Sequence, residues 1–452
     1  MLFCAAAAFA AEPADWLLSA RWVMTMDSQR RLIENGAVAV KADRIVGVGT
    51  RAELTRRFTA KRTLHRERAI LAPGLINTHT HAPMSLFRGI ADDLRLQEWL
   101  EKFIFPAEAR NVTADFVRWG TRLAMLEMIA GGTTTYTDMY YFEEQIAAVT
   151  KEAGMRGVLG QTVIGFPVPD AKTTAEALSR TEAFLKMYVN DPLIVPAVAP
   201  HAIFTNSDET LIACRRLADK YKAPLVIHLS ETKRENDETI AKRGATPTAA
   251  LEKLGVLTGR TLGAHGVWLD DSDIAILARR GTGIAHCPGS NMKLASGIAP
   301  VAKLLAAGVN VGLGPDGPAG SNNDFSLFEE MDLASKLAKV SSGDPQTLAA
   351  KTVVEMATIG GARALGIDSI TGSLEPGKRA DAIFISIAAP HATPMYDAYS
   401  HMVSALKSSD VTDVFVNGRL LLRDRMHTTL NALLILQKAR EYRERILASL
   451  KN

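Results

Sequence analysis

Cysteine is scarce in this chain of 452 residues, which contains only Cys4, Cys214 and Cys287. Three cysteines cannot form a disulfide framework, and the absence of any C-x-x-C pair excludes a zinc site built from thiolates. A strong net charge is also missing, because 52 basic residues nearly balance 49 acidic ones and leave a formal charge of +3. This balance gives no electrostatic reason to expect nucleic acid or an anionic membrane as a partner.

Long apolar runs are missing too, and no stretch is long enough to span a bilayer. The first residues, MLFCAAAAFAAEPAD, contain a short apolar run followed by AFA, which resembles the cleavage site of a signal peptide. No positive residue precedes this run, as a complete signal would require. Residues 1–13 are therefore either a signal remnant of a periplasmic or exported protein, or a disordered end of a cytoplasmic one.

Apolar runs alternate with longer amphipathic stretches through the middle of the chain. Eight runs have the composition of buried strands: ILAPGLINTHTH, GGTTTYTDMY, GMRGVLGQTVIG, LIVPAVAPH, APLVIHLSET, RTLGAHGVWL, GTGIAHCPGSN and NVGLGPDGPA. Most are separated by segments such as DFVRWGTRLAMLEMIAG, with apolar residues at i, i+3, i+4 and i+7, as in helices. The alternation predicts an α/β fold with a (β/α)8 TIM-type barrel over residues 71–370.

The two ends of the chain have a different character from the middle. Residues 14–70 and 371–430 hold short strand-like runs with turn signals, such as DVFVNGRLLLRD. Because both segments flank the barrel, we expect them to pair into one small composite β-sandwich domain. Residues 431–452 include NALLILQKAREYRERILASL, which predicts an amphipathic C-terminal helix.

Polar side chains stand at the ends of several predicted barrel strands. Side chains alternate across a strand, so His79 and His81 face the same side. His228, His265 and Asp316 end three further strands, and the carboxyl ends of barrel strands meet at the face that holds active sites. Unpaired, such buried groups would each cost about 1–3 kcal/mol. A metal site explains their convergence better than the alternative, a hydrogen-bonded polar layer.

The predicted ligand types indicate which ion is expected. Imidazole and carboxylate ligands without thiolate favour one Zn²⁺, and they are also compatible with Fe²⁺ or Mn²⁺. A catalytic ion keeps a position for water and lowers the pKa of that water toward about 7. Glu231 follows His228 by three residues, on the loop that leaves the same strand. A carboxylate there fits a general base that later acts as the acid.

Six motifs occur in order over nearly the whole chain: PGLINTHTH, HLSET, GAHGVWL, HCPGSNMKLASG, GPDGPAGSNNDFSLFEEM and GSLEPGKRADAIFI. Together they resemble the amidohydrolase superfamily and, within it, the 5-methylthioadenosine/S-adenosylhomocysteine deaminase-like group. The resemblance implies a deformed barrel, a composite β-sandwich and one divalent metal ion, usually zinc. By position, it implies the metal ligands His79, His81, His228 and Asp316.

The resemblance also implies roles in catalysis and substrate binding. Glu231 would shuttle protons, and His265 would hydrogen-bond the attacking water instead of binding a second ion. Glu108, in FIFPAEAR, matches a glutamate that contacts ribose hydroxyls, and His201, in AVAPHAIF, matches a histidine that contacts substrate. Glu231 and Asp316 would complete the substrate contacts, with Asp316 also catalytic. Without the resemblance, Glu108 would be an ordinary carboxylate at a helix start and His201 a polar strand end.

One position departs from the family pattern, near the end of the third barrel strand. Some members have an arginine there that holds the polar tail of a substrate, whereas this chain has Gly160 and Gln161. The missing guanidinium removes a natural partner for a carboxylate, which argues against S-adenosylhomocysteine as the preferred substrate. Cys287 has no assigned general base and is predicted to be a packing residue.

The sequence therefore predicts an enzyme, a metal-dependent amidohydrolase that removes the amino group of a purine-like ring and releases ammonia. Adenosine, 5′-methylthioadenosine and S-adenosylhomocysteine represent the expected substrate type. The alternative is hydrolysis of an s-triazine or another substituted heteroaromatic ring, because the same core residues would serve a different leaving group. A non-catalytic binding protein is disfavoured, since every expected ligand is present. The expected partner is a small heterocyclic molecule, and a homo-oligomer is compatible with the sequence.

Overall fold

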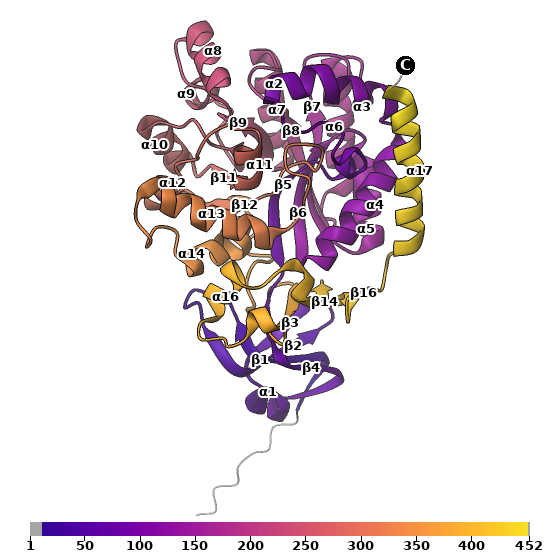
Figure 1. Cartoon of the computed structure of the whole chain (residues 1–452), viewed down its shortest axis with the longest axis vertical. Helices are drawn as coiled ribbons and strands as arrows, with labels where there is room; N and C mark the ends of the chain where they lie inside the picture. The colour runs from indigo at the N-terminus through magenta and orange to yellow at the C-terminus, as the bar shows by residue number, and fades with distance from the viewer. Residues whose placement is uncertain (1–10, 451–452) are drawn as a thin grey trace, which may run out of the picture.

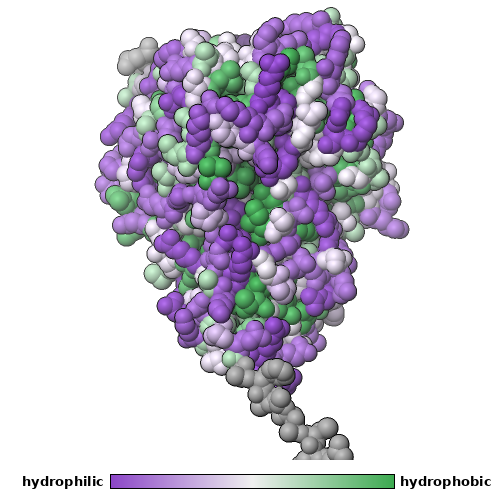
Figure 2. Space-filling view, turned by 180° about the vertical axis from the view of Figure 1, so that it is seen from behind, coloured by the Kyte–Doolittle hydropathy of each residue, from purple (hydrophilic) through white to green (hydrophobic). Residues whose placement is uncertain are grey.

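The computed structural model describes residues 11–450. Of the predicted signal remnant or disordered end, residues 1–10 lie outside this range, and Glu12 and Pro13 already belong to strand β1 (Glu12–Met24). Within the described range, no helix is both long enough and apolar enough to cross a membrane. Figure 2 shows that hydrophilic residues cover most of one face of the molecule, with smaller apolar patches among them.

Eight parallel strands close into a barrel, which confirms the predicted (β/α)8 fold. Each of the eight predicted runs contains one of these strands. In chain order they are β5 (Leu75–Thr80), β6 (Thr133–Tyr140), β7 (Arg156–Val163), β8 (Ile194–Pro200), β9 (Leu225–Leu229), β10 (Thr261–His265), β11 (Gly283–His286) and β12 (Val311–Leu313). Neighbours in the barrel follow chain order, and β12 closes it against β5.

Helices surround the barrel and connect its strands (Figure 1). Several begin at a side chain that accepts a backbone N–H, such as Thr113 before α4 and Ser207 before α7. Between β5 and β6 lie the 3-10 helix η1 (Ala82–Phe87), α2 (Leu96–Glu98), the π-helix η2 (Trp99–Ile104), α3 (Phe105–Asn111) and α4 (Ala114–Ala130). The others are α5 (Glu143–Ala153), α6 (Thr174–Tyr188), α7 (Asp208–Tyr221), α8 (Lys233–Arg243), α9 (Pro247–Lys253), α10 (Asp271–Arg280), α11 (Pro288–Lys293), α12 (Val301–Ala306), α13 (Leu327–Ser342), α14 (Ala350–Glu355), the π-helix η3 (Met356–Gly360) and α15 (Gly361–Ala364).

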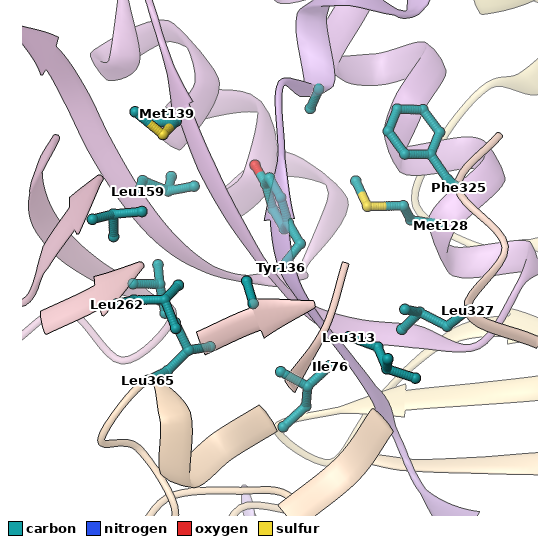
Figure 3. Close-up of a cluster of buried hydrophobic side chains, with 14 of the residues drawn as sticks. Ile76, Met128, Tyr136, Met139, Leu159, Leu262, Leu313, Phe325, Leu327 and Leu365 are labelled. Atoms are coloured by element: carbon teal, nitrogen blue, oxygen red, sulfur yellow. The ribbon is translucent and has the colours of Figure 1, made fainter. Parts of the chain in front are cut away.

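A buried apolar cluster holds the barrel strands to the surrounding elements. Figure 3 shows Ile76, Tyr136, Leu159, Leu262 and Leu313, which come from five different barrel strands, within one such cluster. All five are almost completely inaccessible to solvent. Full burial of a large apolar side chain contributes about 1.5–3 kcal/mol to the free energy of folding. Because the contributors are distant in sequence, this stabilisation exists only in the closed barrel.

Strands from both chain ends form one mixed sheet of eight strands, as the predicted composite β-domain requires. Its order is β16-β15-β14-β13-β4-β1-β2-β3. Trp16 of β1 and Phe415 of β14 pack with ring centroids 5.3 Å apart, although two strands separate them in the sheet, so the sheet curls over its own core. The remaining strands are β2 (Leu32–Lys41), β3 (Arg44–Thr50), β4 (Phe58–Pro73), β13 (Ala382–Ser386), β14 (Val411–Val416), β15 (Arg419–Arg423) and β16 (Met426–His427).

Short helices accompany this sheet, and the chain ends in a long one. The short ones are α1 (Arg51–Arg57), η4 (Pro390–Ala392), α16 (Ala398–Ser404) and η5 (Ser408–Asp410). The last helix, α17 (Ala432–Leu450), runs along the outside of the barrel beside α4 (Figure 1). The residue boundaries proposed above for the domains stay predictions.

A single residue, Gly74, separates β4 of the sheet from β5 of the barrel. The predicted run ILAPGLINTHTH therefore contains parts of two strands that belong to different sheets. A Cβ atom at Gly74 would collide with the side chain of Thr134, so only glycine fits this close approach. The sheet consequently lies against the amino ends of the barrel strands, and the carboxyl ends stay open for a site.

A buried ion pair joins the two parts of the molecule. Arg156, the first residue of β7, donates through Nε and Nη2 to Asp381, which precedes β13. The Nη2–Oδ2 distance is 3.1 Å, and the two side chains are 2% and 1% exposed. Asp381 also accepts hydrogen bonds from the Thr371 hydroxyl and the Asn417 backbone N–H. The two charges and their hydrogen bonds compensate each other for the loss of hydration. Either charge buried without its partner would be strongly destabilising.

We expect Asp381→Ala to lower the free energy of unfolding by about 3–5 kcal/mol, because it leaves the Arg156 charge buried and unpaired. Urea unfolding followed by circular dichroism measures this loss. The matched control is Glu12→Ala, which breaks the pair of Glu12 with Arg57, where both side chains are 55% exposed. Its effect should be about 1 kcal/mol or less. Equal losses in the two variants would contradict the structural role of the buried pair.

Candidate active site

A cavity opens at the carboxyl ends of the barrel strands. Its lining combines apolar side chains with a few convergent polar groups, which is the usual composition of a site for a small organic molecule. The segment from α2 to α3 covers one side of it through Leu96, Trp99, Leu100, Ile104 and Phe105. The lining includes seven of the eight site residues that the sequence predicted: His81, Glu108, His201, His228, Glu231, His265 and Asp316. The eighth, His79, is fully buried beneath the cavity beside them.

Four histidines and one aspartate form a single cluster at the base of the cavity. The ligand atoms of His79, His81 and Asp316 lie within 4.8 Å of one another, as do those of His79, His228 and His265. Asp316 Oδ1 is 3.3 Å from Nε2 of His79 and 3.3 Å from Nε2 of His81. Because both groups share His79, the five side chains that the sequence predicted to converge do so.

The hydrogen bonds of two histidines orient them as metal ligands. Nδ1 of His81 lies 2.7 Å from the carbonyl oxygen of Met139, and Nδ1 of His228 lies 2.8 Å from that of His201. A carbonyl oxygen only accepts, so Nδ1 carries the hydrogen in both rings. In the neutral form of each ring the lone pair therefore sits on Nε2, which is the usual arrangement of a metal-binding imidazole.

His79 provides a direct test of whether a metal ion fits. Neither of its ring nitrogens has a hydrogen-bond partner among residues 11–450, although the side chain is completely buried. An unsatisfied buried polar atom is costly, and buried polar groups are nearly always paired. A divalent cation at this cluster would satisfy His79, and the donor set of imidazoles and one carboxylate suits Zn²⁺.

Two of the three proposed imidazole ligands are already in the protonation state that binds metal. Burial lowers the pKa of His79 to about 4 and holds the pKa of His228 well below its usual range, so both rings are neutral at pH 7. His81 is buried too, but its contact with Asp316 outweighs burial and raises its pKa to about 9, so a metal ion that binds there displaces a proton. Burial by itself raises the pKa of Asp316, but the imidazoles of His79 and His81 outweigh it and hold that pKa well below its usual range. Asp316 is thus an anion in a buried position.

Glu231 faces the cluster from the loop after β9. Its Oε2 lies 3.8 Å from Nε2 of His265, and burial raises the pKa of its carboxyl group. The backbone N–H groups of Ser230 and Glu231 donate to the carboxylate of Glu235, at 3.2 and 2.8 Å. Glu235 therefore holds the turn that carries Glu231, a contact that the sequence analysis missed. The T-x-x-E spacing from Thr232, which is a capping signature, was the available signal.

Helix α11 orients two other residues of the site. Ser290 donates its hydroxyl hydrogen to Asp316 Oδ2 at 2.7 Å, and Asn291 Oδ1 lies 3.0 Å from Nδ1 of His265. The side chains of these two neighbours thus set the directions of a predicted ligand and a predicted catalytic group, roles that the sequence analysis did not assign. Cys287, which precedes the helix, is buried, and burial raises the pKa of its thiol well above the usual range, as expected of an inert cysteine.

Three site residues have left-handed backbone conformations that are rare outside glycine. The φ angles are 49° at Ser230, 74° at His265 and 66° at Asp316. Conformations of this kind cost about 1–3 kcal/mol each and persist where the surrounding structure imposes them. Here each of them directs the chain out of a barrel strand and into the site.

The two predicted substrate contacts, Glu108 and His201, both line the cavity. Glu108, on α3, is buried and accepts hydrogen bonds from the hydroxyls of Tyr140 at 2.6 Å and Tyr141 at 3.2 Å. Burial raises the pKa of Glu108 to about 7, against the lowering effect of the two phenols. The Nδ1 atom of His201 lies 3.1 Å from the hydroxyl of Thr205. The tyrosines were missed, although their place at the end of β6 puts them at the open face.

The end of β7, where the sequence has Gly160 and Gln161, presents no arginine to the cavity. No lysine or arginine lines the cavity in the described part of the chain. Gln161 donates to Asp170 at 2.8 Å and accepts from the backbone of Glu143 at 3.3 Å, so its amide is engaged outside the cavity. The wall instead contains apolar side chains, among them Phe105 and Phe204.

Comparison with known proteins identifies similar sequences and folds. Residues 70–421 match the model of the amidohydrolase family, and residues 36–60 match that of an imidazolonepropionase-like composite domain of bacteria. The chain is 46% identical over 440 residues to 5-methylthioadenosine/S-adenosylhomocysteine deaminase 1 of Syntrophus aciditrophicus, which covers 97% of this chain and 99% of that protein. An adenosine deaminase of Xanthomonas campestris with bound zinc superposes with a TM-score of 0.95 at 39% identity, over 97% of this chain and 100% of the other.

The alternative predicted from the sequence, triazine hydrolysis, has a more distant relative. The zinc complex of atrazine chlorohydrolase from Arthrobacter aurescens TC1 superposes with a TM-score of 0.87, over 94% of this chain and 99% of that one. Its sequence is 24% identical. A likeness at this level establishes the shared fold and no more.

Proposed function

The chain belongs to the amidohydrolase family, and on that basis we propose that it is a metal-dependent hydrolytic deaminase of adenosine-type substrates. The reaction replaces the amino group of a purine-like ring with oxygen and releases ammonia, so the enzyme acts on a C–N bond other than a peptide bond. One observation carries this proposal: a buried histidine–aspartate cluster lies beside Glu231 at the base of the cavity, and the ring nitrogens of His79 at its centre make no hydrogen bond within the described residues. The 46% identity to a deaminase supports the choice of reaction.

The enzyme uses one divalent metal ion, and zinc is the ion in the similar adenosine deaminase. We propose that His79, His81, His228 and Asp316 hold it. When bound, such an ion acts as a Lewis acid that lowers the pKa of a water molecule and so supplies a nucleophile at neutral pH.

Glu231 moves the protons in the proposed reaction. Water adds at the ring carbon that bears the amino group, and the carboxylate of Glu231 takes up the proton that the water loses. The same carboxyl group passes this proton to the adjacent ring nitrogen. The proton left on the new hydroxyl then moves to the amino group, so the C–N bond breaks, a ring carbonyl forms and ammonia leaves. Burial raises the pKa of Glu231 and so helps it to hold a proton between the two transfers. Asn291 orients the ring of His265, which we propose forms a hydrogen bond with the attacking water.

The substrate is held away from the reacting carbon by other groups. We propose that Glu108 accepts hydrogen bonds from the ribose hydroxyls and that His201 also contacts the substrate. Beyond them, the wall is apolar and has no cationic side chain among the described residues. A small neutral group at the 5′ position suits this wall, whereas the charged tail of S-adenosylhomocysteine would lose its hydration without gaining an ionic partner.

We expect a screen for ammonia release to show the highest kcat/KM with adenosine or 5′-methylthioadenosine, and a lower value with S-adenosylhomocysteine. The physical reason is the absence of a cation for the amino-acid tail. The zinc-loaded enzyme should be assayed on these nucleosides and, in parallel, on amino- and chloro-substituted triazines with detection of ammonia and chloride. A preference for S-adenosylhomocysteine would show that the cavity does not need a cationic side chain to bind the amino-acid tail. Activity confined to triazines would refute the proposed reaction.

A further inference from the structure

Glu108 is bonded by two consecutive tyrosines, which is unusual for one carboxylate. Neighbouring side chains of a regular strand point to opposite faces. Strand β6 ends at Tyr140, so Tyr141 lies just beyond the regular strand. The rings of Tyr140 and Tyr141 lie together, with centroids 4.7 Å apart. Each phenol then donates to a different oxygen of the Glu108 carboxylate.

The remaining hydrogen-bonding capacity of Glu108 has a definite geometry. An ionised carboxylate has two oxygens and about four lone-pair positions. Tyr140 occupies one position on Oε1 and Tyr141 occupies one on Oε2. One acceptor position therefore remains on each oxygen, and all three side chains line the cavity. Two acceptors side by side match the two hydroxyls of a vicinal diol.

The same contacts fix the direction of the carboxylate. Glu108 comes from α3, in the segment that covers the cavity, whereas Tyr140 ends the barrel strand β6 and Tyr141 follows it. The phenols thus tie a side chain of the covering segment to the rigid barrel. All three side chains are nearly inaccessible to solvent, so water competes poorly for these bonds.

We propose that Tyr140 and Tyr141 are positioning residues that orient Glu108 to take a vicinal diol, and that they thereby set the preference of the enzyme for ribosides. This inference rests on the proposed function, because ribose is the diol of an adenosine-type substrate. Neither tyrosine touches the reacting carbon in this role. Their effect should appear in how tightly the riboside is held, and it should disappear with a substrate that has no diol.

The test compares adenosine with 2′,3′-dideoxyadenosine in the wild type and in Tyr140→Phe, which removes the hydroxyl and keeps the ring. The wild type should strongly prefer adenosine, because a site built to pair with hydroxyls rejects analogues that lack them. In Tyr140→Phe, kcat/KM for adenosine should fall about 10- to 100-fold, as for one lost hydrogen bond to a charged group. The fall should come mainly from KM. With the dideoxy substrate, kcat/KM should barely change, so the preference shrinks.

Two further variants complete the design. Tyr141→Phe should lower the preference for adenosine by a smaller factor, because the Tyr141 hydrogen bond to Glu108 is longer than that of Tyr140. If Tyr140→Phe does not fold, Tyr141→Phe provides the same test. The matched control is Tyr136→Phe, which removes a buried hydroxyl of the same strand that pairs with Thr150 outside the cavity. It should leave the preference unchanged, even if it lowers the thermal midpoint.

The outcomes separate this inference from the proposed function. No activity on any adenosine derivative, or equal rates of the wild type with adenosine and its dideoxy analogue, would overturn the riboside role and this inference with it. A wild type that discriminates, together with tyrosine variants that lose activity equally on both substrates, would show that the phenols only support packing and would overturn this inference alone. An unchanged preference in both tyrosine variants would do the same.

Discussion

Glu231→Gln will keep its metal ion and lose about 10²- to 10⁴-fold in kcat, which is the usual contribution of positioned proton transfer. Glutamine has nearly the shape of glutamate, but its amide cannot take up and return a proton. The side chain of Glu231 lies beside His265 and is absent from both groups of ligand atoms at the cluster. The substitution should therefore leave metal binding intact and remove only the proton transfer.

The measurement combines kcat for ammonia release with elemental analysis of the same protein sample. The control is Glu238→Gln, a change of the same kind on α8, where Glu238 pairs with Arg234 at the surface. It should leave both quantities unchanged. Near-normal turnover of Glu231→Gln on a good substrate would show that another group moves the protons. Loss of the metal in that variant would instead make Glu231 a ligand.

His228→Ala should abolish both metal binding and turnover. The Nδ1 atom of His228 is engaged with the backbone of His201, so Nε2 is directed at the cluster. Removal of an inner ligand of a buried site leaves the ion with incomplete coordination. Chelation of the wild-type metal should have the same effect on turnover, and added zinc should restore it.

Elemental analysis of both proteins measures the metal content per chain. His286→Ala is the matched control, because His286 is also a buried histidine at the end of a barrel strand but belongs to neither group of ligand atoms. It should keep the metal even if it destabilises the fold. Full metal content after His228→Ala, or two tightly held ions per chain in the wild type, would contradict the proposed site with one metal.

Much of this architecture could be predicted because it is encoded in short segments. The barrel follows from strand and helix patterns that each occupy fewer than twenty residues, and the C-terminal helix follows in the same way. The order of the polar residues at strand ends then places His79, His81, His228, His265 and Asp316 at one face, since the topology of a barrel brings all carboxyl ends together. No tertiary contact had to be known for that step.

Other features depend on contacts that no local pattern contains. The break at Gly74 was not predicted, because it arises from the close approach of Thr134 in a neighbouring strand. The orientation of His265 depends on Asn291, which is 26 residues away. The bonds from Tyr140 and Tyr141 to Glu108 join segments that are 32 and 33 residues apart.

The sequence by itself thus determined the fold and the set of polar residues that converge at the open face of the barrel, because side-chain type and strand periodicity are local properties. Only the tertiary structure decided which groups orient those residues, how Glu108 is aimed and which charges are absent from the cavity wall. Gln161 illustrates the difference, since its presence could be seen in the sequence but its engagement with Asp170 could not. The physical reason is that hydrogen bonds between distant segments form only after the barrel has closed and excluded water from them.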